Sequence, residues 1–238
     1  MQDQGHIVSS FDRDLEAIQA LIMKMGGLVE ESILNASIAL EKRDEKLAKS
    51  VRDGDKLIDK LEEQVNEEAA RILALRAPTA GDLRTVLSVF RVSANLERIG
   101  DYSKNIAKRS SVVIQMQPIV GTASSLRRMA KTVDLMLKDV LDAYIQRDVD
   151  LAADVRERDA EVDQMYSALF REYLTFMMED PRNITACMHL HFMAKNIERM
   201  GDHVTSIAEQ VIYLVTGELP DDDRPKQDRT PYEQGQET

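Results

Sequence analysis

The sequence has 238 residues, with 31 lysines and arginines against 42 aspartates and glutamates, and a net charge of −11. This acidic balance argues against DNA or RNA as the main ligand and against stable docking on anionic lipid, because both need a strongly cationic surface. Only 10 glycines, 6 prolines, 6 tyrosines and 5 phenylalanines are present, and there is no tryptophan. That composition is poor for a turn-rich β sandwich and favours long helices.

The single cysteine, Cys187, cannot form an internal disulfide or a cysteine-rich zinc site, so we expect a reducing, cytoplasmic location. The N-terminus lacks the charged and then apolar pattern of a signal peptide, and no run of about 18 apolar residues occurs. Any membrane association is therefore expected to come only through partner proteins.

Helix-breaking residues fall at wide intervals, at Pro78 and Gly81, Pro118 and Gly121, and Asp180 with the proline after it. The two longest intervals each contain a charged break, at 42–44 and at 146–148. The pattern predicts six helices, near residues 11–42, 44–76, 82–115, 123–146, 148–179 and 183–217. Such long helices suit an elongated bundle with short turns, and residues 218–238, which are nearly devoid of large apolar groups, are predicted to form a disordered acidic tail.

An internal repeat organises the chain. NLERIGDYSKNIAK at 95–108 aligns with NIERMGDHVTSIAE at 196–209, with seven identities in fourteen positions. VRDGDKLID at 51–59 likewise aligns with VRERDAEVD at 155–163. The sequence is therefore predicted to be all-α, a tandem repeat of two three-helix units, 11–115 and 123–217, packed as an elongated six-helix bundle.

Acidic pairs with i, i+4 spacing recur at matching positions of the two repeats: Asp55 with Asp59, Glu97 with Asp101, Asp159 with Asp163, and Glu198 with Asp202. Residues at this spacing share a helix face, where like charges are mildly destabilising, and a bound cation would offset that cost. Surface pairing with Lys or Arg from adjacent helices is the alternative, since single acidic pairs arise by chance in so acidic a chain. Recurrence of all four pairs, while Lys104 and Thr205 have diverged, favours the cation.

Helical geometry places these carboxylates beside the core. On the third and sixth helices Glu97, Asp101, Glu198 and Asp202 are predicted at the border of the apolar arc. That arc consists of Val89, Val92, Leu96, Ile99 and Ala107 on the third helix, and of Leu190, Met193, Ile197, Met200 and Val204 on the sixth. A cluster of carboxylates with few histidines suits hard cations such as Mg²⁺, Mn²⁺, Ca²⁺ or Fe³⁺ rather than structural zinc, and the sequence leaves the nuclearity open.

Other features carry weaker signals. Gly100 and Gly201 occupy the same place inside two acidic pairs, which suggests close helix packing or room for a bound cluster. Cys187 and His191 share a face and could form a soft-metal pair, although filling apolar space is the stronger interpretation. The basic residues at 84, 91 and 98 form a stripe that is most simply a solvated face. No phosphate-binding loop, nucleophile elbow or ExxH pair is present, so we predict no enzymatic activity.

The duplicated NLERIGD and NIERMGD motifs, with DKLID and DAEVD in the preceding helices, resemble the PhoU family of bacterial phosphate-uptake regulators. FDRDLEAI and LRAPTAGDLRTVLSVFRVSANLERIGDY follow that family in order and spacing, and the resemblance covers about residues 11–217. It implies multinuclear clusters of iron, manganese or zinc on E(D)xxxD motifs, which map onto the four acidic pairs.

The resemblance also implies a function. PhoU-like proteins are cytoplasmic, often homodimeric, negative regulators of the phosphate-starvation response, which connect the ATPase subunit of the phosphate ABC transporter with the sensor histidine kinase PhoR. We accordingly expect a metal-binding adaptor rather than an enzyme. The alternative is a carboxylate-bridged multinuclear metal enzyme or metal-storage bundle, which would need an open coordination position and, for catalysis, a proton-transfer group nearby.

Overall fold

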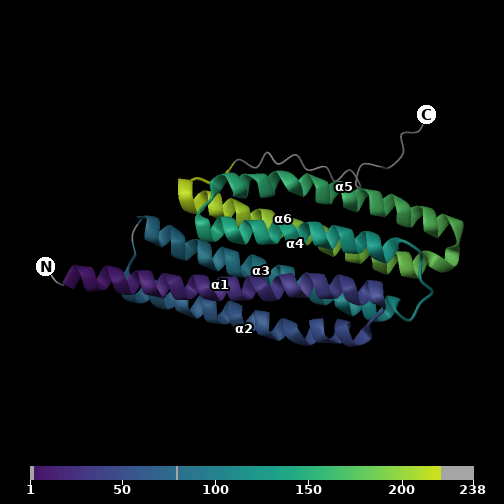
Figure 1. Cartoon of the computed structure of the whole chain (residues 1–238), viewed down its shortest axis with the longest axis horizontal. Coiled ribbons are helices and arrows are strands. Elements are labelled where there is room, and N and C mark those ends of the chain that lie inside the picture. Colours follow the sequence, from purple (N-terminus) through teal and green to yellow (C-terminus); the bar gives the residue numbers. More distant parts are fainter. Residues whose placement is uncertain (1–2, 79, 221–238) are drawn as a thin grey trace.

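The computed structural model describes residues 3–78 and 80–220, and these form an elongated bundle of long helices (Figure 1). The elements are α1 (Asp3–Lys42), α2 (Glu45–Arg76), α3 (Ala80–Val113), α4 (Thr122–Gln146), α5 (Val149–Glu179), a short 3₁₀ turn at Pro181–Asn183, and α6 (Ile184–Thr216). The all-α prediction is confirmed, and the described residues contain no strand. The first helix begins at Asp3 rather than near residue 11. Most of the predicted tail, residues 221–238, lies outside the described residues.

The charged breaks predicted inside the two longest intervals end one helix and begin the next. Arg43 and Arg147 adopt left-handed backbone conformations, with φ of 53° and 56°. The next residue caps the following helix in each case, since Asp44 and Asp148 accept backbone N–H hydrogen bonds at 3.0 Å. Side-chain caps of this kind satisfy N–H groups that have no partner within the helix. An Arg-Asp dipeptide thus produces the same sharp reversal in both repeats.

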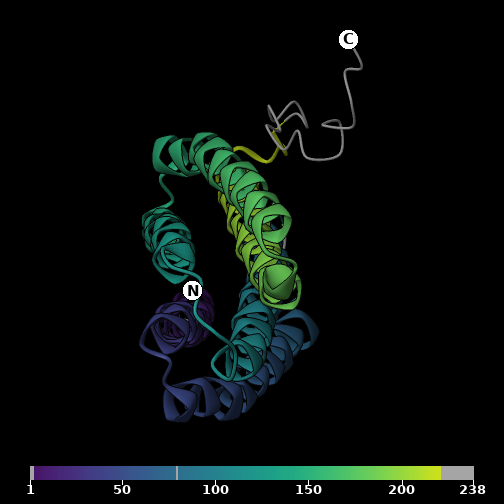
Figure 2. The same ribbon diagram turned by 90° about the vertical axis from the view of Figure 1, so that its right-hand side faces the viewer.

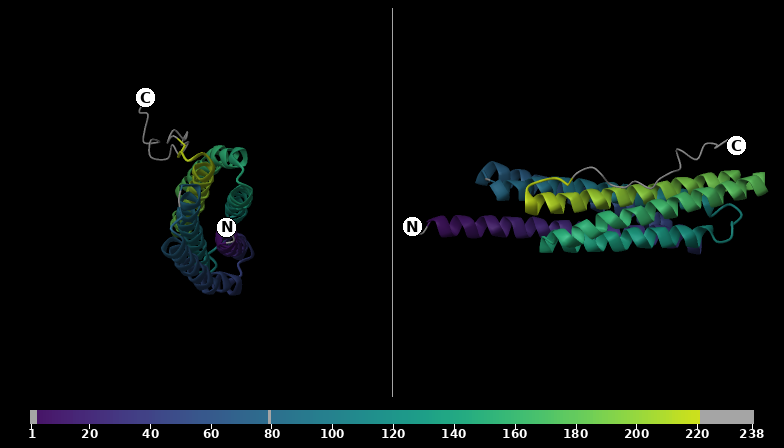
Figure 3. Two further views of the ribbon diagram at one scale, coloured as in Figure 1. Left: turned by 90° about the vertical axis from the view of Figure 1, so that its left-hand side faces the viewer. Right: turned by 90° about the horizontal axis from the view of Figure 1, so that it is seen from above.

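The helices pack as two three-helix units joined side by side. Helices α1, α2 and α3 contact one another, and so do α4, α5 and α6. The units meet through α1 against α4 and α3 against α6. Viewed along the bundle, these four helices occupy the middle, with α2 and α5 at opposite edges (Figures 2 and 3). None of the described helices combines the length and apolarity needed to cross a membrane.

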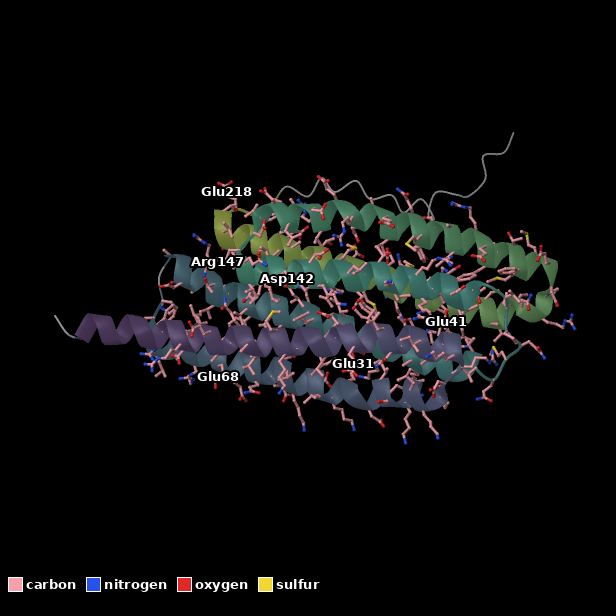
Figure 4. All side chains as sticks on the ribbon, viewed as in Figure 1. Glu31, Glu41, Glu68, Asp142, Arg147 and Glu218 are labelled. Atoms are coloured by element: carbon pink, nitrogen blue, oxygen red, sulfur yellow. The ribbon has the colours of Figure 1, made fainter. Side chains whose placement is uncertain are left out.

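One apolar core runs through both units. All ten residues assigned to the core arcs of the third and sixth helices are buried. They belong to a single cluster that includes Ile22 and Val29 of α1 and Leu137 and Tyr144 of α4. Burial of a large apolar side chain of this kind contributes about 1.5–3 kcal/mol. The contacts of α1 with α4 and of α3 with α6 are therefore apolar and stabilise the bundle. Acidic side chains such as Glu31, Glu68 and Asp142 lie along the outside of the bundle (Figure 4).

A glycine permits the close contact of α1 with α4. A Cβ atom added at Gly26 would lie 2.5 Å from Cδ1 of Leu141, closer than nonbonded carbon atoms come. The neighbouring Gly27 is exposed, and a Cβ atom there would have no atom within 4 Å. The two glycines therefore sit on the same helix in opposite environments.

We expect Gly27→Ala to raise the free energy of unfolding by up to about 1 kcal/mol, because alanine is the better helix former. Gly26→Ala carries the same gain but overpacks the contact with Leu141, which costs about 1–3 kcal/mol. Gly26→Ala should therefore be the less stable of the two variants in urea unfolding. Equal stabilisation by both substitutions would contradict the described contact between the units.

Candidate functional site

The eight predicted site residues gather into two groups, one in each repeat. Cluster 1 comprises Asp55 and Asp59 of α2 with Glu97 and Asp101 of α3. Cluster 2 comprises Asp159 and Asp163 of α5 with Glu198 and Asp202 of α6. The carboxylates interact across each helix pair: burial is the largest cause that raises the pKa of Asp55 and of Glu198, and charges on Asp59 and Asp101 raise the first further, as charges on Asp202 and Asp163 raise the second. The acidic pairs thus converge within each repeat, a point that the sequence left open.

The two repeated glycines bring the helix backbones close to these carboxylates. A Cβ atom at Gly100 would lie 3.0 Å from Cδ1 of Ile58 and 3.8 Å from Oδ1 of Asp55. At Gly201 it would lie 2.8 Å from Oδ1 of Asp159. Both explanations considered for the glycines therefore apply, because the missing side chain leaves room for an apolar contact and for a cluster carboxylate.

A lysine ammonium lies inside cluster 1. Nζ of Lys104 is 2.5 Å from Oδ2 of Asp55 and 3.3 Å from Oδ1 of Asp101. Asp55 is only 2% exposed, and a buried carboxylate needs a partner of opposite charge. The hydrogen bond to Asp55 in turn raises the pKa of Lys104 above its usual value. Lys104 is therefore the counter-ion of the most deeply buried carboxylate in this cluster.

Cluster 2 also contains a lysine. Nζ of Lys195 is 2.7 Å from Oε1 of Glu198 and 4.9 Å from the ring centroid of Tyr166. Glu198 was predicted at the border of the core, but it is buried, with 7% of its surface exposed. Asp163 is buried to the same extent. The ammonium of Lys195 accounts for the burial of Glu198, because an ion pair offsets the cost of placing a carboxylate in an apolar region.

The two lysines do not occupy equivalent positions in the repeats. Lys104 corresponds to Thr205 of repeat 2, and Lys195 corresponds to Ala94 of repeat 1. Each cluster nevertheless contains one ammonium next to a buried carboxylate. Pairing with a lysine or arginine of an adjacent helix was the alternative to a cation, and the contact of Lys104 with Asp55 is of that kind. From the sequence, Lys104 itself was treated only as a diverged neighbour. The available signal was the i, i+3 spacing of Lys104 from Asp101 and of Lys195 from Glu198.

Burial disfavours the ionised form of several of these carboxylates. Burial is the largest cause that raises the pKa of Asp55, Glu97 and Glu198, and that of Glu97 reaches about 7. The charge on Asp101 raises the pKa of Glu97 further, while Arg98 lowers it. Arg98 lies 3.7 Å from Glu97 and its side chain is 62% exposed, so water screens this ion pair. Additional positive charge in cluster 1 would therefore stabilise the ionised form.

The clusters have the ligands of a hard-cation site but not its geometry. Carboxylate oxygens are the preferred donors for such ions, and Oε2 of Glu198 is buried without a hydrogen-bond partner in the described structure. Yet within residues 3–78 and 80–220 no three His, Cys, Asp or Glu side chains are arranged to hold a metal ion. Ammonium groups instead neutralise part of the negative charge of each cluster. The donor chemistry of the clusters thus suits a cation, and the lysine ammonium groups occupy part of each cluster.

The soft-metal alternative at Cys187 and His191 is not supported by their surroundings. Cys187 is fully buried. The His191 ring lies against the rings of Tyr166, Phe170 and Phe192, with centroids 5.4–5.9 Å apart. The two side chains fill apolar space, which was the preferred interpretation.

Tyr102 and His203, which hold the same position in the two repeats, meet across the contact of α3 with α6. Their ring centroids are 5.7 Å apart, and the Nδ1–H group of His203 donates a 2.8 Å hydrogen bond to Asn95 Oδ1. Repeat-equivalent side chains that touch each other indicate that α3 and α6 are related by a local pseudo-twofold axis. This symmetry allows any site on the α3–α6 contact to be compared with its repeat-related counterpart.

A family model for the PhoU domain matches the chain twice, at residues 22–110 and 126–211. The chain belongs to the PhoU family. It is 46% identical to the phosphate-specific transport system accessory protein PhoU homolog of Rhizobium meliloti (strain 1021), over 95% of each chain. It is 44% identical to the protein of that name from Caulobacter vibrioides (strain NA1000 / CB15N), over 94% of this chain and 97% of the relative.

Solved structures of the PhoU family share this fold. The crystal structure of PhoU from Pseudomonas aeruginosa superposes with a TM-score of 0.84 at 38% identity, over 87% of this chain and 100% of that one. The phosphate transport system regulatory protein PhoU from Streptococcus pneumoniae gives 0.81 at 30% identity, over 89% and 99%. The two-repeat bundle is therefore the architecture of the PhoU family over nearly the whole described chain.

The raised pKa of Glu97 predicts that Glu97→Gln stabilises metal-free protein at pH 8 but not at pH 4. Between its ordinary value of 4.5 and about 7, the folded state binds more protons than the unfolded state, so stability falls as pH rises through that window. The shift sets an upper limit of about 3 kcal/mol. Since the side chain is 23% exposed, we expect about 1 kcal/mol, or a rise of ~2–4 °C in Tm.

Thermal unfolding of chelator-treated protein at both pH values measures this effect. Glu63→Gln on the exposed side of α2 is the control and should change Tm little at either pH. A stabilisation by Glu97→Gln that is equal at pH 4 and pH 8 would show that ionisation of Glu97 is not its cause.

Proposed function

We propose that this chain is the accessory protein of a phosphate-specific transport system and a negative regulator of phosphate uptake and of the phosphate-starvation response. The observation that carries the proposal is the match, over nearly the full length of both chains, to relatives with that accessory name. The match spans both repeats and all eight cluster residues, so it concerns the whole bundle. A regulator of this kind acts through protein contacts and turns over no substrate.

The proposed partners are the ATPase subunit of the phosphate ABC transporter and the sensor histidine kinase PhoR, both approached from the cytoplasm. When phosphate is plentiful, the protein stabilises the inhibited or phosphatase state of the kinase. A protein contact of this type needs long, rigid, exposed faces, and the outer faces of α2 and α5 at the two edges of the bundle provide them. We also propose that the working form is a homodimer.

Deletion of the gene should make phosphate-starvation genes constitutively active in phosphate-rich medium. A reporter driven by a phosphate-starvation promoter measures the effect, and a plasmid copy of the wild-type gene is the control that should restore repression. Normal repression in the deletion strain would refute the regulatory proposal. The experiment does not depend on metal binding, so it tests regulation alone.

The second part of the proposal is that each cluster binds a hard or borderline cation such as iron, manganese or zinc. In repeat 1 the ligands would be Asp55, Asp59, Glu97 and Asp101, and in repeat 2 Asp159, Asp163, Glu198 and Asp202. A bound cation supplies positive charge to carboxylates whose pKa values burial has raised. The protein residues position the oxygens on two facing helices, and the glycines keep the backbones close enough for them to meet.

The lysines bear directly on this metal proposal. The ammonium of Lys104 contacts two of the four carboxylates of cluster 1, so it competes with a cation for the same oxygens. Lys195 competes in the same way at Glu198. Metal occupancy and the lysine ion pairs are therefore alternatives, and a metal ion must bind strongly enough to displace an ion pair that is partly buried.

Metal content should fall in the double variant Asp101→Ala/Asp202→Ala. Both side chains are only half-buried and each belongs to a different cluster, so the helical fold should remain. Inductively coupled plasma mass spectrometry on protein purified without chelator or a nickel column gives the number of metal atoms per chain. Two or more atoms in the wild type, mostly lost in the variant, are expected.

The matched control is Glu63→Ala/Glu67→Ala, which removes two carboxylates at i, i+4 spacing from the exposed surface of α2. This control should keep the metal content of the wild type, because the pair lies outside both clusters. Equal metal content in all three proteins would exclude the clusters as the metal sites. Circular dichroism of each variant checks that the helices are intact.

A further inference from the structure

A half-open cleft of about 350 Å³ lies between α3 and α6, on the side of α3 turned toward the second unit. It is lined by Asn105, Lys108, Arg109 and Val112 of α3 and by His189 and Asn196 of α6. Five of these six side chains are polar, and no carboxylate lines the cleft. Its residues belong to neither carboxylate cluster, and the function proposed above does not use them.

The lysine and the arginine of this cleft form no ion pair with the described residues. In the described part of the chain, no carboxylate lies within 4 Å of the charged nitrogens of Lys108 or Arg109, although the chain has 42 acidic residues. His189 lies next to Arg109, and burial together with the Arg109 charge lowers its pKa. Positive charge is therefore concentrated in the cleft without compensation from the protein.

Arg109 lines the cleft and has more N–H donors than its contacts with the described residues use. Its guanidinium carbon lies 4.4 Å from the centroid of the Phe192 ring. A guanidinium can only donate, so Nδ1 of His189, 3.4 Å from Arg109, is the acceptor of that contact and the proton of a neutral His189 is on Nε2. Packing on Phe192 and the bond to His189 hold Arg109 in place, and each of the cleft's Lys, Arg, His and Asn side chains can donate a hydrogen bond.

The pseudo-twofold axis supplies an internal comparison. At the repeat-related place Lys108 is replaced by Glu209, Arg109 by Gln210 and His189 by Ser88. Glu209 there lies 3.6 Å from Arg156 of α5. The contact of α3 with α6 thus also forms at the repeat-related place, where the three basic side chains are absent, so packing of α3 on α6 does not require them. Their presence together at only one of these two places points to a ligand.

We propose that this cleft binds a small oxyanion of the phosphate class, either free phosphate or the phosphate group of a small monoester. Lysine and arginine donate charge-assisted hydrogen bonds to such ions, and the planar guanidinium suits two oxygens at once. Asn105 and Asn196 can donate to the remaining oxygens from the two helices that form the cleft. The charge and geometry of the cleft favour such a ligand whether or not the protein acts as a regulator.

Isothermal titration calorimetry of the full chain at low ionic strength, with inorganic phosphate and separately with AMP, tests the proposal. We expect saturable binding of one anion per chain, and Lys108→Gln/Arg109→Gln should weaken it at least about tenfold, or about 1.4 kcal/mol. The control Lys49→Gln/Lys56→Gln removes two exposed cations from α2 and should change the affinity less than about twofold, near 0.4 kcal/mol. Tighter binding of phosphate identifies the free ion as the ligand, and tighter binding of AMP identifies the monoester.

A second variant keeps the test valid if loss of both cations disturbs the contact of α3 with α6. Asn196→Asp places a carboxylate in the cleft without removing a cation and should also weaken anion binding at least about tenfold. Absence of saturable binding of either anion to the wild type would overturn the proposal. An equal loss of affinity in the cleft variants and in the α2 control would overturn it as well, because the effect would then reflect net charge only.

Discussion

Burial of carboxylates between two facing helices is the constraint on which the rest of this site depends. An unpartnered carboxylate in an apolar region is too costly to remain ionised. In this bundle Asp55 and Glu198 are buried and each has an ammonium within ion-pair distance. The remaining negative charge of each cluster is not neutralised by the lysine alone. The net negative charge of each cluster would therefore be lowered further by any additional cation that binds there.

Duplication has preserved the carboxylates and not their counter-ions. Lys104 and Lys195 come from non-equivalent positions, yet each reaches a buried carboxylate in its own repeat. Each cluster therefore has one ammonium beside a buried carboxylate, supplied from a different position of the three-helix unit. The common feature is the physical need of a buried carboxylate for a partner of opposite charge.

The sequence predicted the fold well because the signals for it are local. Helix ends follow from Arg43-Asp44 and Arg147-Asp148, where a left-handed residue precedes a capping aspartate. The apolar arcs of α3 and α6 follow from helical periodicity, and their members are buried. The recurring acidic pairs could be found by comparing the repeats. Their convergence within each repeat could not, because it depends on which helices pack together.

What the sequence could not provide is the environment of each charged group. Lys104 reaches Asp55 from another helix, 49 positions along the chain, and only the packing of α2 on α3 shows the contact. Burial of Glu198 depends likewise on the α5 residues opposite it. The cleft between α3 and α6 is harder still to predict from the sequence, since Arg109 and His189 are 80 residues apart. Neither residue has a partner at a suggestive spacing on its own helix, so sequence periodicity gives no signal for the pair.

Helix α3 joins the two charged features of the first repeat. Asp101 and Lys104 face α2, while Lys108 and Arg109, one turn further along, line the cleft with α6. A single rigid helix thus carries an acidic cluster on one side and an uncompensated basic cleft on another. In the second repeat Glu209 and Gln210 stand where these two cations would be, and α6 contributes only His189 and Asn196 to the cleft. Since the scaffold and the acidic cluster are present in both copies, the pair of cations on α3 is a chemical feature that repeat 1 has and repeat 2 lacks.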